Sequence, residues 1–99
     1  MFNGNFYQAT HPVAVGTPAI HKMDCQKPWT YGVTIPDIAG ASALVEFTLS
    51  PWAAINAGTA NWFPLGADLV ASGYGSSVAP VSALRCTANG SPCTLEVVQ

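Results

Sequence analysis

The chain has 99 residues, enough for one domain whose core is small relative to its surface, so contact with partners would add useful stability. Charged residues make up 8% of the sequence and hydrophobic residues 49%, whereas an average soluble protein is roughly 25% charged. So little charge predicts that much of the surface faces other protein. A formal net charge of −2 argues against nucleic acid as a partner, because a DNA-binding surface typically neutralises about 6–10 phosphates.

The sequence predicts neither a membrane segment nor a secretion signal. No apolar run approaches the ~20 residues that a membrane span needs. The first residues also lack a basic stretch followed by an apolar one. We therefore expect a soluble protein that is made in the cytoplasm, with no membrane partner.

Residues 1–28 are predicted to form an extended arm outside a folded domain at residues 29–99. They contain Pro12 and Pro18 and show neither strand nor helix periodicity. The segment is too apolar for a solvated tail, so we expect it to order on a neighbouring subunit. A loosely ordered terminus is the alternative. The predicted interface residues of this arm are Phe2, Phe6, Tyr7, Val13, Val15 and Ile20.

From Trp29 onwards, apolar and polar residues alternate as they do in half-buried strands. Strands are predicted over residues 29–35, 43–49, 62–65, 68–71, 81–87 and 94–99. Residues 51–60 and 72–77 are predicted loops, and the first of them has room for a turn or two of helix. Several short strands with many turn residues are typical of a β-sandwich or barrel.

The last two strands are predicted to form a hairpin around Asn89-Gly90, a dipeptide favoured in type I′ turns. This register would place Leu84 opposite Leu95, Cys86 opposite Cys93, and Arg85 diagonal to Glu96. A slip by one residue would mix the apolar and polar faces, so the alternation itself supports the register.

The sequence predicts no catalytic residues and no metal or cofactor site. There is no Gly-x-Ser-x-Gly elbow, and both histidines, His11 and His21, fall in the predicted arm. Cys86 and Cys93 lack the spacing of a zinc site, and Cys25 has at most a poor ligand set around it. Cys86 and Cys93 could form a disulfide, although a reducing cytoplasm favours two packed thiols.

Four aromatic residues, Trp29, Trp52, Trp62 and Tyr74, could form a platform that stacks on sugars. Packing in the core or at an interface is the commoner use of such large rings. Trp52 lies in the predicted loop between Pro51 and Ala53, so we expect it to be exposed. It is the predicted anchor residue of an interface.

Four segments resemble the small β-sandwich structural proteins of tailed bacteriophages: Val45–Leu49, Asn61–Gly66, Pro80–Cys86 and Thr94–Gln99. The resemblance extends over roughly residues 43–99. Those proteins carry an Asp-Gly turn before the Asn-Trp pair. Here Ala57-Gly58-Thr59-Ala60 replaces that turn and lacks the acidic residue.

The fold expected from these patterns is an all-β, antiparallel β-sandwich of jelly-roll-like form with an extended N-terminal arm. The resemblance implies a non-enzymatic virion protein, of the decoration or cement type, that bridges and stabilises capsid subunits. Its partners would be the major capsid protein and further copies of itself. The alternative is a tail or fibre module that binds another tail protein or a host glycan. A small host-directed enzyme or inhibitor is the least favoured reading.

Overall fold

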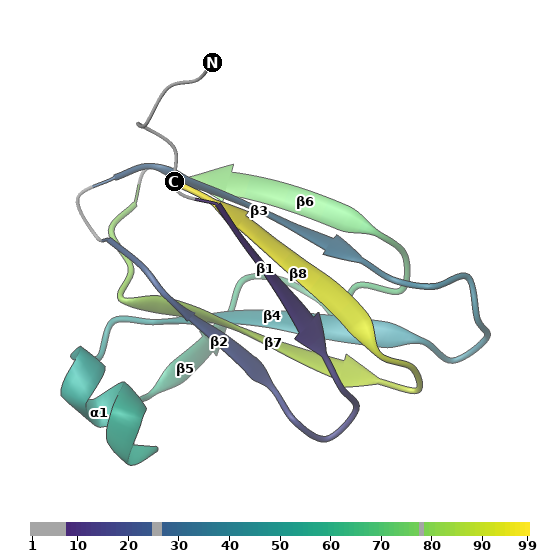
Figure 1. Cartoon of the computed structure of the whole chain (residues 1–99), viewed down its shortest axis with the longest axis horizontal. Coiled ribbons are helices and arrows are strands. Elements are labelled where there is room, and N and C mark those ends of the chain that lie inside the picture. Colours follow the sequence, from purple (N-terminus) through teal and green to yellow (C-terminus); the bar gives the residue numbers. More distant parts are fainter. Residues whose placement is uncertain (1–7, 25–26, 78) are drawn as a thin grey trace.

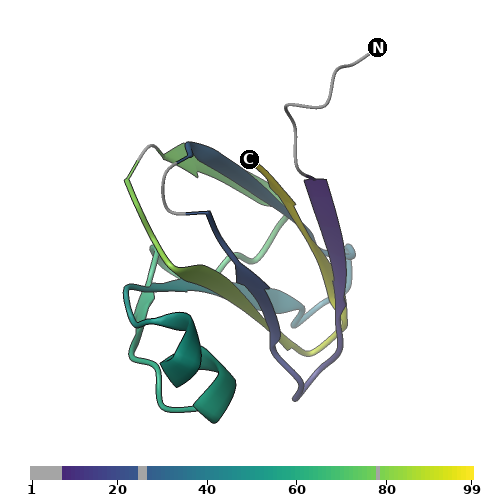
Figure 2. The same cartoon turned by 60° about the vertical axis from the view of Figure 1, so that its left-hand side comes forward.

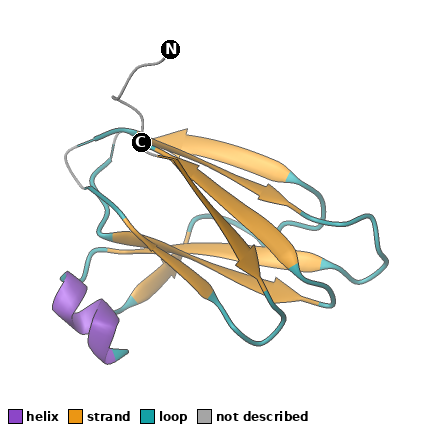
Figure 3. Ribbon diagram, in the orientation of Figure 1, coloured by secondary structure: helices purple, strands orange, loops and turns teal. Residues whose placement is uncertain are grey.

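The computed structural model of the chain describes residues 8–24, 27–77 and 79–99. These form two four-stranded sheets that pack face to face, with one short helix, α1 (Trp52–Ala57), at one end (Figures 1 and 3). In spatial order the first sheet contains β1 (Gln8–Val13), β8 (Cys93–Val98), β3 (Trp29–Thr34) and β6 (Gly73–Ser77). The second sheet contains β2 (Ala19–Lys22), β7 (Ala83–Asn89), β4 (Ser42–Thr48) and β5 (Trp62–Pro64).

The strand pairing is nested. β1 pairs with β8, β2 with β7, β3 with β6 and β4 with β5, all antiparallel. Two further pairings, β3 with β8 and β4 with β7, complete the sheets. A chain of eight strands that doubles back on itself and rolls into two sheets in this way is a jelly roll. The predicted antiparallel, jelly-roll-like sandwich is therefore confirmed.

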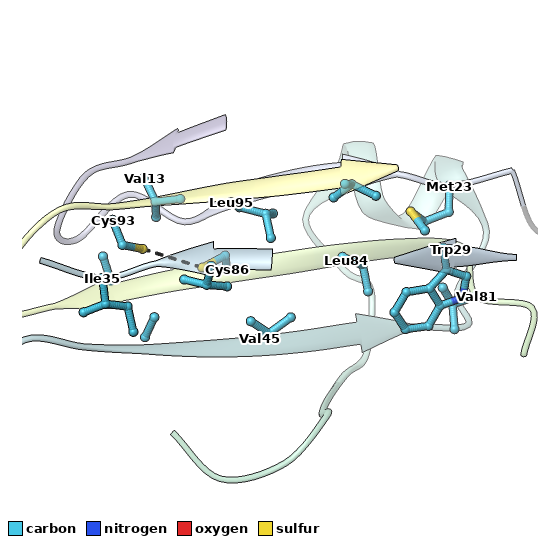
Figure 4. Close-up of a cluster of buried hydrophobic side chains, with 14 of the residues drawn as sticks. Val13, Met23, Trp29, Ile35, Val45, Val81, Leu84, Cys86, Cys93 and Leu95 are labelled. Atoms are coloured by element: carbon cyan, nitrogen blue, oxygen red, sulfur yellow. Dashed lines mark hydrogen bonds between the residues drawn. The ribbon is translucent and has the colours of Figure 1, made fainter. Parts of the chain in front are cut away.

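The core lies between the two sheets and is built from side chains that alternate along each strand (Figure 4). Leu84 on β7 and Leu95 on β8 are both 0% exposed, and complete burial of such a side chain stabilises the fold by about 1.5–3 kcal/mol. The same cluster includes Val13, Met23, Trp29, Val33, Ile35, Val45, Val81, Cys86, Cys93 and Val97.

Helix α1 fits the turn or two that the sequence allowed between β4 and β5. It ends at Gly58, whose left-handed φ of 76° directs its N–H back to the carbonyls of the last turn. Ile55 is the buried residue of this helix, and the Trp52 indole N–H donates a hydrogen bond of 3.1 Å to the Ser82 carbonyl. These contacts fix so short a helix, which could not persist alone.

The predicted hairpin between the last two strands is wrong, because β7 and β8 lie in different sheets. A type I′ turn needs positive φ at both central residues. Among the described residues only glycines have positive φ, so Asn89 does not adopt that conformation. The connection crosses between the sheets, and Cys86 and Cys93 meet across the core with their sulfurs 3.8 Å apart. The two leucines pair elsewhere: Leu84 with Phe47 and His21, and Leu95 with Val33 and His11.

The extended arm predicted at residues 1–28 is not confirmed. Residues 8–13 and 19–22 form β1 and β2, which add to the edges of the two sheets. Pro12 argues against a strand when the sequence is read alone, because proline cannot donate a hydrogen bond to the neighbouring strand. An edge strand such as β1 tolerates it. The core also extends into this segment, because Val13 is only 1% exposed.

Two smaller predictions in the β5–β6 region are also wrong. Residues 72–77, expected to be a loop, contain β6, and residues 68–71, expected to be a strand, contribute only one bridge, between Leu69 and Ala43. Gly73 and Gly75 are poor strand formers by themselves. Pairing with β3 keeps these glycines in a strand despite their low intrinsic preference for that conformation.

We predict that Gly90→Ala destabilises the protein more than Gly16→Ala. Both glycines have positive φ (77° and 82°), and alanine in that region costs about 1–2 kcal/mol. A Cβ at position 90 would also overlap the Gly40 carbonyl, whereas a Cβ at position 16 would meet nothing within 4 Å. Overpacking adds about 1–3 kcal/mol. Urea unfolding followed by tryptophan fluorescence measures both losses, and equal losses would contradict the predicted clash.

Candidate functional site

The four edge strands of the sandwich differ in how they resist pairing with other chains. Three carry a feature that discourages strand addition: β1 contains Pro12, β2 is four residues long and contains Lys22, and β5 is three residues long and ends at Pro64. The remaining edge strand, β6, has the sequence Gly-Tyr-Gly-Ser-Ser, without charge or proline. Of the four sheet edges, the outer side of β6 is therefore the one best suited to pair with another strand.

Beside β6, the two sheets separate into a groove of about 480 Å³. Its apolar lining comes from both sheets: Trp29, Tyr31, Phe47, Leu49, Leu65 and Val81. Leu49 is 62% exposed, and the neighbouring Phe63, which stacks on Phe47 at 5.6 Å, is 47% exposed. None of the described lining residues carries a charge. An apolar, uncharged groove next to an open strand edge is typical of a protein-docking surface.

Gly75 of β6 shapes the wall of this groove. It pairs directly with Tyr31 of β3, and a Cβ at position 75 would lie 2.9 Å from Cε1 of that ring. Because Gly75 has no side chain, the Tyr31 ring can pack directly against the β6 backbone. Trp29 is fixed beside it, because its indole N–H donates a hydrogen bond of 2.8 Å to the Ala79 carbonyl.

On the opposite long side of the sandwich, a short turn joins β1 to β2 (Figure 2). Two histidines of these strands bridge the gap between the sheets there. His11 Nε2 and His21 Nδ1 share a hydrogen bond of 2.9 Å between the edges of the two sheets. Burial lowers the pKa of His21, and the charge of His11 lowers it further. One of the two bonded nitrogens must lack a proton, so the doubly protonated pair is incompatible with this contact.

The outer face of the second sheet carries a stack of polar and aromatic side chains. Arg85 donates two hydrogen bonds, of 3.0 and 2.8 Å, to one carboxylate oxygen of Glu46 on the neighbouring strand. Its guanidinium also lies 4.6 Å from the centre of the Trp62 ring. The predicted partner Glu96 lies in the other sheet. The predicted pairing of Arg85 with Glu96 is therefore wrong, because it depended on a hairpin between β7 and β8.

The structure describes four of the predicted interface residues: Val13, Val15, Ile20 and Trp52. Val13 belongs to the core, which corrects its assignment to an interface. Val15 and Ile20 are 52% and 41% exposed, in the β1–β2 turn and on β2. Trp52 is 50% exposed and lies under the ammonium group of Lys22, 5.8 Å from its ring centre. The remaining three, Phe2, Phe6 and Tyr7, lie outside the described residues.

The groove cannot be predicted from the sequence pattern, because its residues come from four separate segments of the chain. Tyr31 and Phe47 follow the inward alternation of their strands, which predicts core positions. Whether such a residue is covered depends on which strand lies at the edge, and the edge is set by the topology. The one local signal is the Gly-Tyr-Gly sequence at positions 73–75, where glycines permit close approach of another group.

Comparisons of the chain with protein-family models, curated proteins and solved structures gave no significant match. Within residues 8–24, 27–77 and 79–99, no group of three or more His, Cys, Asp or Glu residues is placed to hold a metal ion. No helix in the same part of the chain is long and apolar enough to cross a membrane.

We predict that the protein loses stability as the pH falls below about 6.5, the ordinary histidine pKa. The pKa of His21 is lower in the folded chain than in the unfolded one, so the unfolded chain binds more protons in this range. The stabilisation is therefore complete above that pH and declines below it, by at most about 1.4 kcal/mol per pH unit for one proton. Urea unfolding at a series of pH values measures the slope.

The control for this pH dependence is His21→Gln, which keeps a polar side chain at the position but cannot titrate. Its unfolding free energy should change less between about pH 7 and pH 5 than that of the natural chain. A slope unchanged by the substitution would show that other groups cause the pH dependence.

Proposed function

We propose that this chain is a non-enzymatic structural protein that binds other protein through the open side of the sandwich, as a decoration protein on a bacteriophage capsid. The observation that carries the proposal is the uncharged apolar groove beside β6. It offers the partner both a hydrophobic pocket and a free strand edge. The occupant is an extended segment of a capsid subunit, which adds to β6 by main-chain hydrogen bonds and inserts an apolar side chain between the sheets.

The composition agrees with such a role. A surface of low charge avoids the desolvation cost of burying ions when the protein is covered by partners. The groove contributes aromatic rings, which bury large areas and commonly dominate binding energy. The jelly roll adds support by analogy alone, since viral capsid proteins and lectins both use this fold. The virion setting comes from the resemblance of residues 43–99 to phage structural proteins.

The first test compares Gly75→Ala with Gly73→Ala for binding to virions from which the protein has been removed. A Cβ at position 75 would lie 2.9 Å from the Tyr31 ring, so this ring, which lines the groove, must shift, whereas a Cβ at position 73 makes an ordinary contact of 3.4 Å with Leu69. We expect Gly75→Ala to raise the dissociation constant at least about tenfold, as loss of one good contact does. Gly73→Ala should bind like the natural chain. Circular dichroism first establishes that both variants are folded.

Equal binding by the two variants would show that the groove does not contact the partner. A Tyr74→Ala variant gives a second reading, because this side chain is 87% exposed on the same strand and yet does not line the groove. It should leave binding close to that of the natural chain. A loss as large as that of Gly75→Ala would place the contact on the outer face of the first sheet.

The second test is the copy number in purified virions, measured by quantitative gel densitometry. A decoration protein should saturate at a number set by capsid symmetry, and virions that lack it should lose their genome at lower temperature. Bound protein stabilises the shell by mass action, so adding it back should restore the heat resistance. A copy number of about a dozen or fewer, as ring symmetry in a tail would give, would favour the tail module instead.

A further inference from the structure

Two cysteines from opposite sheets meet inside the sandwich (Figure 4). Cys86 lies on β7 and Cys93 on β8, and their sulfur atoms are 3.8 Å apart. Both are free thiols, and both are buried, at 0% and 5% exposed. The two sulfurs are therefore in van der Waals contact, and a shift of less than 2 Å would bring them to the ~2.05 Å of a disulfide bond.

Cys93 is the more accessible of the two residues, at 5% exposed against 0% for Cys86. It is also one of the residues that line a surface cavity of about 410 Å³, with Pro12, Val13, Ala14, Thr34, Pro36, Pro92 and Thr94, whereas Cys86 is not. A small reagent is therefore expected to reach Cys93 before Cys86.

We propose that Cys86 and Cys93 form an oxidation site whose substrate is a small disulfide, and that its product is a disulfide between the two sheets. The thiolate of Cys93 attacks one sulfur of the small disulfide, which forms a mixed disulfide and releases one small thiolate. The thiolate of Cys86 then attacks the Cys93 sulfur and releases the second small thiolate. Two electrons pass to the small disulfide, and the two protons lost by the cysteines give two small thiols.

The environment of Cys86 limits the rate of the second step, the attack of Cys86 on the mixed disulfide. Burial raises the pKa of its thiol to about 12, and the neighbouring Cys93 raises it in the same direction. Only the thiolate attacks a disulfide, so little of Cys86 is reactive at neutral pH. The pair therefore stays reduced under brief or weak oxidation, and the second step accelerates about tenfold for each unit by which the pH rises towards that pKa.

The product joins two strands that lack hydrogen bonds to each other, because β7 and β8 belong to different sheets. Their only covalent link in the reduced chain is the short connection through Gly90, so the disulfide closes a small loop. We expect it to raise the melting temperature by roughly 10 °C, the shift that closing a loop of this size implies for a domain of about this length.

The test uses the full-length chain with Cys25→Ser, so that Cys86 and Cys93 are the remaining thiols. The folded protein is incubated with oxidised glutathione at several pH values, and its intact mass is followed. We expect loss of two hydrogen masses, at a rate that rises steeply with pH, and a higher melting temperature for the product. No loss of hydrogen at any pH at which the protein stays folded would overturn the proposal.

Single-cysteine variants test the order of attack. With Cys86→Ser added, the mixed disulfide has no resolving thiol, so a stable adduct of one glutathione should accumulate on Cys93. With Cys93→Ser added instead, Cys86, which is 0% exposed and whose raised pKa leaves little thiolate, should form adduct at least about tenfold more slowly. Equal adduct formation by both variants would overturn the assignment of Cys93 as the first thiol. This site does not depend on the docking groove, so either proposal can fail alone.

Discussion

The structure depends on the packing of β7 against β8 across the core. These strands lie inside the two sheets, each with a neighbour on both sides, and their inward residues are almost completely buried. The connection between them crosses from one sheet to the other, and Gly90 permits that crossing where a side chain would meet the Gly40 backbone. Every other strand takes its place by pairing with one of these two or with β3 or β4. Loss of this contact would separate the sheets.

The gap between the two sheets is filled differently on the two long sides of the sandwich. On each side, the two edge strands belong to different sheets and do not pair with each other. On the β1–β2 side a pair of histidines bridges the gap, so closure there depends on protonation. On the β5–β6 side, apolar side chains line the gap and remain partly exposed. This difference is the physical basis for placing the docking surface on the second side, because exposed apolar area gains most from a partner.

Sequence alternation was enough to predict the fold class and several strands, since inward and outward residues differ strongly from Trp29 onwards. It could not predict which strands are partners. The pattern around Cys86 and Cys93 is the same for a hairpin in one sheet and for two strands that face each other across a core. Alternation also failed where Pro12 and Gly75 weaken local preference, because there the neighbouring strand determines the structure. The groove could not be predicted for the same reason, since it lies between two edge strands whose positions are set by the topology.

The nested pairing also orders events during synthesis. The innermost pair, β4 with β5, is separated only by α1 and its flanking residues, whereas β1 and β8 are separated by most of the chain. Of these eight strands, β1 is synthesised before the others and its partner β8 after them, so the apolar side chains of β1 to β4 lack their final neighbours in the meantime. Pairings between distant segments slow folding and expose unpaired edges to aggregation meanwhile. The same topology that buries Leu84 and Leu95 completely in the finished protein thus leaves apolar side chains of the earlier strands uncovered until β7 and β8 have been made.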